Sequence, residues 1–263
     1  MKISNRTVWI TGASSGIGEA LAYALSDRGA QLVLSARRAE ELKRVQSACT
    51  DPDRHIITPL DLADDDTLRA AVDDVHDRMG PVDIMIHNGG ISQRSLVQNT
   101  DLSVDRRIME VNYFGAVTLT KLVLPSMLER GQGHFVVISS VVGKFGTPKR
   151  SAYAASKHAL HGFFDSLRAE VHDDGLRVTL VCPGFVKTNV AHNALTDDGT
   201  PLSERKDEVK EVGIPPAKCA RQIARAIERE KDEVTIGGWE TMGVYAKRFV
   251  PSLFSAAIRR VNV

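Results

Sequence analysis

The chain has 263 residues and carries 34 Lys and Arg against 33 Asp and Glu, which gives a formal net charge of +1. With 43% hydrophobic residues it differs from disordered chains, and its balanced charge differs from the strongly basic chains that bind nucleic acids by general electrostatics. The longest run without a charged residue, 131–143, is shorter than the roughly 18 residues that a membrane-spanning helix needs. We therefore expect no nucleic-acid partner and no transmembrane span.

The amino terminus and the cysteines point to a reducing compartment. Residues 1–6 are short and polar and lack the basic start, apolar core and cleavage site of a signal peptide. Cys49, Cys182 and Cys219 are too few and too scattered for a disulfide framework or a four-ligand zinc site, and we expect them to be buried as small hydrophobic residues. The sequence predicts a cytoplasmic protein without a bound metal.

Apolar runs typical of buried strands alternate with helical patterns from the first residues onward. This alternation predicts an α/β fold: a single doubly wound (Rossmann) domain over 1–263, with a seven-stranded parallel sheet and helices on both faces. The predicted strands are 7–11, 31–36, 55–58, 83–87, 135–139, 177–182 and 233–236, and the predicted helices are 17–25, 39–49, 68–79, 104–130, 152–172 and 216–230.

Two segments depart from this rhythm. Residues 189–212 are rich in charged residues and glycine, and we expect either mobile surface or a lid, because the segment follows the sixth strand and could cover a ligand crevice. The carboxyl-terminal extension, 239–263, mixes large apolar residues with lysine and arginine. Such a segment can lie on a membrane surface, or it can pack at a subunit interface or over the substrate cleft, which we favour.

A glycine-rich turn joins the first strand to the first helix, in the sequence TGASSGIG at 11–18. Glycines at this place let the backbone approach a pyrophosphate, which the helix amino terminus then binds with its free N–H groups and its dipole. The spacing Gly-x-x-x-Gly-x-Gly differs from the standard dinucleotide fingerprint, and an ordinary strand–helix turn is the alternative.

The end of the second strand indicates which dinucleotide is bound. Proteins that bind NAD place an acid there to hold the ribose 2′-hydroxyl. This chain has Ala36 followed by Arg37 and Arg38, and a guanidinium pairs with a 2′-phosphate where an acid would repel it. The sequence favours NADP(H) over NAD(H), unless the arginines only begin a solvated helix.

Tyr153 and Lys157 are four residues apart in a helical pattern and therefore face the same side of their helix. A lysine ammonium near a phenol favours the phenolate and lowers a pKa that starts at about 10, so the tyrosine could exchange a proton with an alcohol or a carbonyl. Ser140, at the end of the predicted fifth strand, could hydrogen-bond the substrate oxygen. The tyrosine–lysine spacing alone is nonspecific, and an exposed helical pair is its ordinary explanation.

Together these motifs resemble the short-chain dehydrogenase/reductase family over nearly the whole chain. Within the family, the run from NGGISQRS through SAYAASKHA looks like the dehydrogenase/reductase member 7 group. Mammalian members of that group carry an amino-terminal membrane anchor, and we expect none in this sequence. The matching motifs are TGASSGIG (11–18), HNGG (87–90), VNYFGAV (111–117), ISS (138–140), YAASK (153–157) and PGFVKT (183–188).

The resemblance implies a role for each matching position. Tyr153 would be the general acid or base, Lys157 would bind the nicotinamide ribose, and Ser140 would orient the substrate oxygen. Asn112 would distort its helix and hold a water that links Lys157 to bulk solvent. The expected cofactor contacts are Gly12, Ser14, Ser15, Gly16, Ile17 and Gly18 at the phosphates, Asp61 and Leu62 at the adenine, Asn88, Gly89 and Gly90 along the adenosine, and Pro183, Gly184, Val186 and Thr188 at the nicotinamide.

The family pattern Asn-Asn-Ala-Gly is replaced here by His87-Asn88-Gly89-Gly90. We expect His87 to be a satisfied core histidine, and we expect the missing methyl group at Gly89 to loosen the loop slightly. Neither change is expected to prevent the chemistry.

The resulting hypothesis is an NADP(H)-dependent oxidoreductase that interconverts a carbonyl and a primary or secondary alcohol by hydride transfer. A catalytically silent cofactor-binding protein and a membrane-peripheral relative are the alternatives. The resemblance also implies a homodimer or homotetramer that associates through the helices 104–130 and 152–172. The substrate is left open among steroids, sugars and acyl compounds, with a pocket expected from 92–96, 141–145, Phe185 and the lid.

Overall fold

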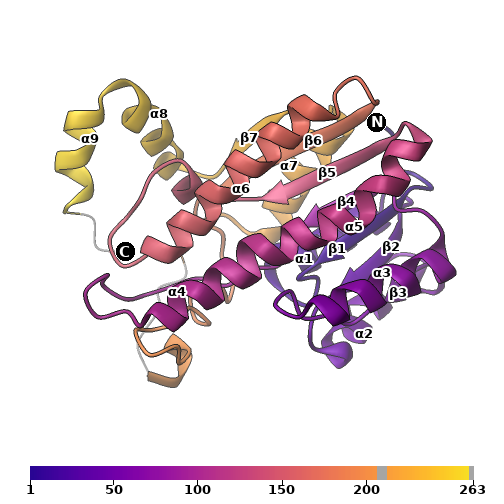
Figure 1. The fold of residues 1–263 in the computed structure, drawn as a ribbon, viewed down its shortest axis with the longest axis horizontal. Helices are drawn as coiled ribbons and strands as arrows, with labels where there is room; N and C mark the ends of the chain where they lie inside the picture. The colour runs from indigo at the N-terminus through magenta and orange to yellow at the C-terminus, as the bar shows by residue number, and fades with distance from the viewer. Residues whose placement is uncertain (206–211, 261–263) are drawn as a thin grey trace.

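A computed structural model describes residues 1–205 and 212–260 (Figure 1). All seven strands lie in one parallel sheet, in the order β3-β2-β1-β4-β5-β6-β7. The sheet and its fold class are therefore as predicted. The strands are β1 (Thr7–Thr11), β2 (Gln31–Ser35), β3 (Ile56–Ile57), β4 (Ile84–His87), β5 (Gly133–Ile138), β6 (Leu176–Pro183) and β7 (Glu233–Ile236).

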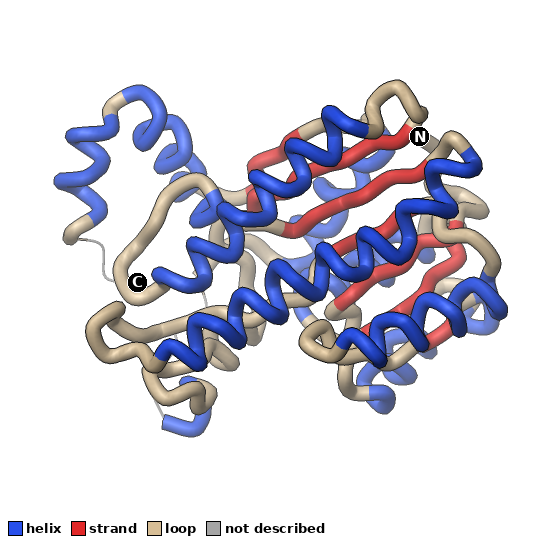
Figure 2. Tube along the Cα trace, viewed as in Figure 1, coloured by secondary structure: helices blue, strands red, loops and turns tan. Residues whose placement is uncertain are grey.

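Helices cover both faces of the sheet, because its strands are apolar on both sides and must be shielded from water twice (Figure 2). One face packs against α1, α2 and α7, and the other packs against α3, α5 and α6. The helices are α1 (Gly16–Ser26), α2 (Ala39–Ser47), α3 (Asp65–Met79), α4 (Leu102–Met109), α5 (Gly115–Arg130), α6 (Ser151–Glu170), α7 (Pro216–Glu228), α8 (Met242–Phe249) and α9 (Pro251–Ile258).

Two predicted elements differ from the structure. The third strand is limited to Ile56–Ile57, since only these two residues pair with β2. The long helix predicted over 104–130 begins at Leu102 and is divided by a π-helical turn at Glu110–Phe114. The hydrophobic periodicity does not reveal this turn, because the chain remains helical on both sides of it.

The strand order reverses between β1 and β4, and the loops that follow these strands meet at their carboxyl ends. In doubly wound sheets this switch point is where ligands bind. The glycine turn after β1 and the loop after β4 both lie there, and the loop after β5 and the start of α6 adjoin them. The fold thus gathers the predicted site residues at one edge of the sheet.

Candidate functional site

The glycine turn after β1 has the shape of a phosphate cradle. Gly12 and Gly16 have positive φ angles of 65° and 62°, which residues with side chains rarely adopt. A Cβ on Gly12 would lie 2.7 Å from the Gly89 Cα, and one on Gly16 would lie 3.1 Å from the Thr188 Cγ2. Ser15 precedes α1 without capping it through its side chain. The first N–H groups of α1 therefore have no side-chain cap and suit a phosphate.

The loop after β4 holds this cradle in place. The Asn88 amide donates hydrogen bonds to the carbonyl oxygens of Thr11 at 3.0 Å and Gly12 at 3.1 Å. In return, the Thr11 hydroxyl accepts hydrogen bonds from the backbone N–H groups of Asn88 and Gly89, both at 3.1 Å. Gly18 packs so closely on Gly12 and Asn88 that a side chain would not fit. The residues predicted around the phosphates and the adenosine thus form one connected unit.

Gly89 does not loosen its loop, which corrects the expectation from sequence. A Cβ at this position would lie 2.5 Å from the Leu62 Cδ1, so the Leu62 side chain fills the space that an alanine methyl group would need. Leu62 also packs against the start of α5 at Gly115. The neighbouring predicted residue, Asp61, forms an ion pair with Arg107 at 3.6 Å.

The end of β2 presents two arginines without acidic partners. Arg37 and Arg38 are exposed, and neither forms an ion pair with a residue in the described ranges. Arg44, one turn into α2, shows the contrast, because it pairs with Glu19 at 2.8 Å and with Glu41 at 2.9 Å. Two free guanidiniums beside the phosphate cradle fit the predicted 2′-phosphate site.

Ser140 and Tyr153 meet at the carboxyl end of β5. The Ser140 hydroxyl donates to the Pro183 carbonyl and accepts from the Val142 N–H, both at 3.3 Å. Burial raises the pKa of Tyr153, and the charge of Arg150 and a hydrogen bond with Ser140 lower it in part. Tyr153 is partly exposed, so its phenol can reach a ligand while it stays protonated at neutral pH.

Lys157 lies one turn after Tyr153 on α6, with its Nζ 5.8 Å from the centre of the tyrosine ring. The ammonium donates to the Ile138 carbonyl at 2.8 Å, and burial lowers its pKa to about 8. A Cβ on Gly90 would lie 3.6 Å from this Nζ and 3.0 Å from the Asn112 Oδ1. The glycine therefore leaves room for a lysine and an asparagine that sequence reasoning placed in one site.

Asn112 lies inside the π-helical turn, where the helix is distorted as the resemblance implied. Its side chain accepts from the Ile91 N–H at 2.8 Å and donates to the Ile91 carbonyl at 2.9 Å and to the Ser156 hydroxyl at 3.0 Å. These bonds join the loop after β4 to α6. The structure thus gives Asn112 a positioning role, and its expected water remains a prediction.

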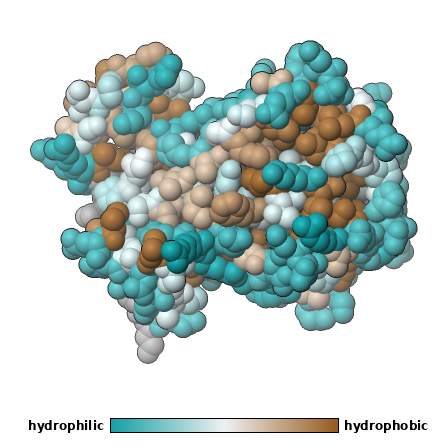
Figure 3. Space-filling model, viewed as in Figure 1, coloured by the Kyte–Doolittle hydropathy of each residue, from teal (hydrophilic) through white to brown (hydrophobic). Residues whose placement is uncertain are grey.

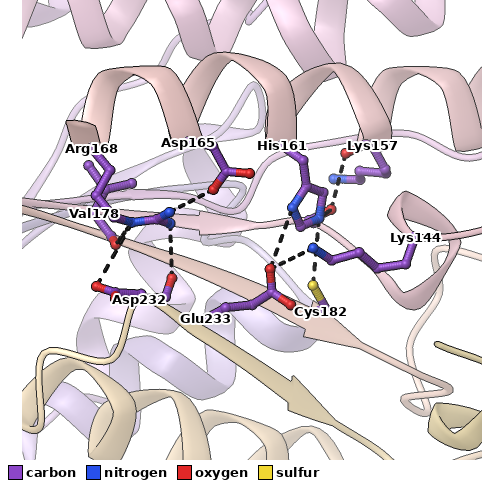
Figure 4. A network of polar contacts seen from close by, with 10 residues as sticks. Lys144, Lys157, His161, Asp165, Arg168, Val178, Cys182, Asp232 and Glu233 are labelled. Carbon is purple, nitrogen blue, oxygen red and sulfur yellow. Dashed lines mark hydrogen bonds and ion pairs between the residues drawn. The ribbon is translucent and has the colours of Figure 1, made fainter. Parts of the chain in front are cut away.

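A polar network fixes α6 against the sheet behind Lys157 (Figure 4). The Ser139 hydroxyl donates to the Lys157 carbonyl at 3.2 Å and hydrogen-bonds the His161 Nε2 at 3.0 Å. Glu233 on β7 binds the Lys144 ammonium at 2.6 Å and lies 3.8 Å from the His161 Nδ1. Because burial lowers the pKa of His161 to about 4, the imidazole is neutral near pH 7 and only Lys144 forms an ion pair with Glu233.

Glu240 holds the loop after β6 and was not predicted from sequence. Its Oε1 accepts hydrogen bonds from the N–H groups of Phe185 and Gly238, both at 2.9 Å. A Cβ on Gly184 would clash with this carboxylate, which gives Gly184 a packing reason in addition to the predicted nicotinamide contact. In the same loop, Val186 forms an isolated parallel β-bridge with Ile214. No local pattern could reveal the contact of Glu240 with the loop after β6, because Phe185 lies far away in the sequence.

His87 and the cysteines are buried in the core, as expected, although the His87 Nδ1 has no hydrogen-bond partner among the described residues. The His87 Nε2 hydrogen-bonds the Thr120 hydroxyl at 2.8 Å, and burial lowers its pKa to about 3. Cys49, Cys182 and Cys219 are buried and free. In the part of the chain that the structure describes, no three His, Cys, Asp or Glu side chains gather as metal ligands.

The predicted lid begins beside the loop after β4. The Leu195 N–H donates to the Ser92 carbonyl at 2.9 Å, and the Arg94 N–H donates to the Leu195 carbonyl at 2.8 Å. Residues 206–211 of the predicted lid lie outside the described residues, and closure over a ligand remains a prediction.

The carboxyl-terminal extension packs beside Tyr153. The Phe254 ring meets the Phe145 ring edge-on with 5.1 Å between their centres, and Val244 and Ile258 join the same apolar cluster. The helices α8 and α9 thus cover the segment after β5. Residues 261–263 of the predicted extension lie outside the described residues. Across 1–205 and 212–260, no helix has both the length and the apolar character to cross a membrane.

A doubly wound parallel sheet with a glycine turn at its switch point defines the class of dinucleotide-binding α/β proteins. The family model described as short chain dehydrogenase matches residues 6–199. The chain belongs to this family of oxidoreductases, whose members bind a nicotinamide cofactor.

Known proteins confirm the resemblance to the member 7 group. A dehydrogenase/reductase SDR family protein 7-like from Anopheles gambiae is 44% identical, covering 96% of this chain and 81% of the relative. Dehydrogenase/reductase SDR family member 7B from Mus musculus is 41% identical, covering 96% and 80%. The crystal structure of a short-chain dehydrogenase from Streptomyces avermitilis superposes with a TM-score of 0.83 at 30% identity, covering 96% of this chain and 95% of that one.

Proposed function

We propose that this protein is an NADP(H)-dependent oxidoreductase that interconverts a carbonyl compound and a primary or secondary alcohol, with Tyr153 as the acid and base. The arrangement of Ser140, Tyr153 and Lys157 beside the glycine cradle carries this proposal. Ser140 is a hydrogen-bonding neighbour of the phenol, and the lysine cation lies 5.8 Å from the phenol ring. A proton donor (Tyr153), a hydrogen-bond donor for an oxyanion (Ser140) and a cation (Lys157) thus lie close together.

The protein residues move and orient a proton in this mechanism. When bound, the nicotinamide supplies the hydride for carbonyl reduction and accepts it in alcohol oxidation. During reduction the Tyr153 phenol gives its proton to the developing alkoxide, which the Ser140 hydroxyl stabilises by a hydrogen bond. The Lys157 cation stabilises the phenolate that remains. In the reverse direction the phenolate takes the alcohol proton.

The preference for NADP(H) rests on the charges at the end of β2. The residues of the cradle fit a dinucleotide, because Gly12 and Gly16 adopt the positive φ angles of a tight turn and the start of α1 has no side-chain cap. Arg37 and Arg38 would bind the 2′-phosphate, and the strand end offers no acid to hold a 2′-hydroxyl.

Turnover of Tyr153→Phe tests the function. We expect the wild type to oxidise NADPH in the presence of a ketone or aldehyde from a carbonyl library. The variant should bind NADPH with an unchanged Kd, measured by nucleotide fluorescence, and should lose about 10²- to 10⁴-fold in kcat. A variant with wild-type turnover would remove Tyr153 from the mechanism, and a wild type that reduces no carbonyl would favour the catalytically silent alternative.

Self-association through α5 and α6 is a further part of the proposal. Figure 3 shows apolar residues gathered on the face that carries these helices. Leu128 of α5 and Phe114, directly before α5, are exposed. A homodimer or homotetramer would bury them. Light scattering measures the molecular mass of the purified wild type and of the Leu128→Glu variant. We expect an oligomer for the wild type and a smaller species for the variant, and the expectation fails if both proteins are monomers.

Peripheral membrane contact is the second candidate, favoured by the outer face of the carboxyl-terminal extension. Trp239, Phe249 and Leu253 are 84%, 76% and 70% exposed. Flotation with anionic liposomes tests this contact, and a chain that stays with the soluble fraction would support the proposed cytoplasmic location.

A further inference from the structure

Arg150 lies near Tyr153, and Arg94 lies near Arg150, on two segments that sequence reasoning did not connect. Arg150 immediately precedes α6, three residues before the tyrosine, and Arg94 lies in the loop after β4. Burial lowers the pKa of Arg150 to about 10, and the positive charge of Arg94 contributes to this shift. The charge of Arg150 also acts on the phenol of Tyr153, whose pKa is raised by burial and lowered in part by this arginine. The two like charges are therefore close to each other, and Arg150 is also close to the proton donor.

The backbone around the two arginines is firmly fixed. Gln93 is completely buried, and its Oε1 accepts a hydrogen bond from the Ala152 N–H at 2.8 Å. The Ser95 N–H donates to the Lys149 carbonyl at 3.1 Å. These bonds tie the loop after β4 to the start of α6 on both sides of the arginines. The backbone positions of Arg94 and Arg150 are thus fixed relative to each other.

Neither guanidinium has a partner in the protein. Within 1–205 and 212–260, no hydrogen bond or ion pair involves the side chain of Arg94 or Arg150, and the Nε of each is buried without an acceptor. The Thr147 hydroxyl, on the segment that connects β5 to α6, is also buried and unpartnered. The other buried unpartnered atoms in the described part of the chain are histidine ring nitrogens. A neutral imidazole has one ring nitrogen without a hydrogen, so such an atom need not be an unsatisfied donor. Buried unsatisfied donors are therefore found on the two segments that meet at the start of α6.

Two other arginines whose side chains are largely buried have acidic partners, whereas Arg37, Arg38 and Arg69, which are unpaired in the described ranges, are exposed. Arg130 binds Asp83 at 3.0 Å, and Arg168 binds Asp165 at 2.6 Å. A buried Nε–H group without an acceptor is costly, and two like charges held close together also repel each other. An anion between them would satisfy both sets of N–H groups, and the planar guanidinium matches the paired oxygens of phosphate and carboxylate.

We propose that Arg94 and Arg150 form an oxyanion-binding subsite, and that the substrate is a carbonyl compound, or the matching alcohol, that carries a phosphate or carboxylate group. This inference rests on the proposed function, since it names the substrate class of the same site. The arginines would hold the charged end of the substrate while its carbonyl group faces Tyr153 and Ser140.

Matched substrate pairs test the subsite. Hydroxyacetone is compared with hydroxyacetone phosphate, and ethyl acetoacetate with acetoacetate, by NADPH consumption. We expect the wild type to prefer the anionic member of one pair by at least about tenfold in kcat/KM, and the preferred pair separates phosphate from carboxylate. Arg94→Gln and Arg150→Gln should each reduce that preference about tenfold to a hundredfold, the effect of losing a charge-assisted hydrogen bond. Using the ratio within a pair removes any general loss of activity.

The matched control is Arg69→Gln, an exposed arginine of α3 that has no ion pair in the described ranges. It should keep both the activity and the preference of the wild type. The proposal is overturned if the wild type treats both members of each pair alike, or if both arginine variants keep the wild-type preference.

A binding measurement separates failure of the subsite from failure of the proposed function. With saturating NADP⁺ present to occupy the phosphate cradle, inorganic phosphate or malonate at constant ionic strength should raise the Tm of the wild type and not that of the Arg94→Gln/Arg150→Gln variant. If no carbonyl compound is reduced but this difference in Tm is found, the proposed function fails and the anion subsite stands. If carbonyl compounds are reduced without charge preference and neither anion raises the Tm, the subsite fails alone.

Discussion

The Lys157 ammonium and the Tyr153 phenol ring lie 5.8 Å apart, one helical turn from each other on α6. Burial acts on the two groups in opposite directions, since it raises the pKa of Tyr153 and lowers that of Lys157 to about 8. The lysine is therefore a cation at neutral pH. Its charge favours the phenolate form of Tyr153, whereas burial of the tyrosine favours the neutral phenol. The balance between these effects should appear in the pH dependence of turnover.

Lys157→Met should shift that pH dependence. Alcohol oxidation needs the phenolate, so its rate rises with pH as Tyr153 loses its proton. Without the cation the phenolate is less stable, and we expect this rise to move by about one pH unit or more to higher pH. Initial rates between pH 6 and 10 measure the shift. Lys157→Arg keeps the charge and should move the profile less, and a Lys157→Met profile that coincides with the wild type would contradict the assigned role.

Arg37→Ala should change cofactor preference. Arg37 is exposed and unpaired, and the loss of charge-assisted hydrogen bonds to a 2′-phosphate should raise the Kd for NADPH about tenfold to a hundredfold. The Kd for NADH should change by less than about twofold, because NADH lacks this phosphate. Fluorescence titration with both nucleotides measures the two constants. Arg69→Ala serves as the exposed control, and equal weakening for both nucleotides would refute the role of Arg37.

Gly89 and Leu62 should be energetically coupled. An alanine methyl group at position 89 would lie 2.5 Å from the Leu62 Cδ1, so Gly89→Ala should lower the free energy of unfolding by about 1–3 kcal/mol, as overpacking does. Leu62→Ala empties that space, and the double variant should lose at least about 0.5 kcal/mol less than the sum of the single changes. Urea unfolding of the four proteins completes the cycle. Additive losses would mean that the two positions do not share this space.

The sequence predicted the strands, and it indicated the proposed catalytic residues, because both correspond to short patterns. Apolar runs define β1 and β5, and Tyr153 and Lys157 share one helical turn. Glu240 and Arg150 were missed because their importance comes from contacts between distant segments. Glu240 is defined by the loop after β6, and Arg150 by its proximity to Arg94. The effect of Gly89 was misjudged for the same reason, since Leu62 fills the space from another loop.

Three of the four buried histidines in the described part of the chain should make the fold sensitive to acid. Burial lowers the pKa of His87 to about 3 and those of His134 and His161 to about 4, whereas an unfolded histidine has a pKa of about 6.5. Below pH 6.5 the unfolded chain therefore binds more protons than the folded chain, and the free energy of unfolding decreases as the pH falls toward 4. From pH 7.5 to 5.5 we expect a decrease of about 1 kcal/mol for each histidine, above the range in which most carboxylates titrate.

Urea unfolding at pH 7.5 and 5.5 measures this decrease, and His134→Gln assigns part of it. The His134 Nε2 hydrogen-bonds the Thr179 hydroxyl at 2.8 Å, and a glutamine amide can form a similar bond without titrating. The variant should therefore lose about 1 kcal/mol less than the wild type between the two pH values. His172→Gln changes an exposed histidine and should leave the wild-type decrease intact. If His134→Gln and the wild type lose equal stability, His134 takes up its proton without unfolding, and its burial does not set the acid limit of the fold.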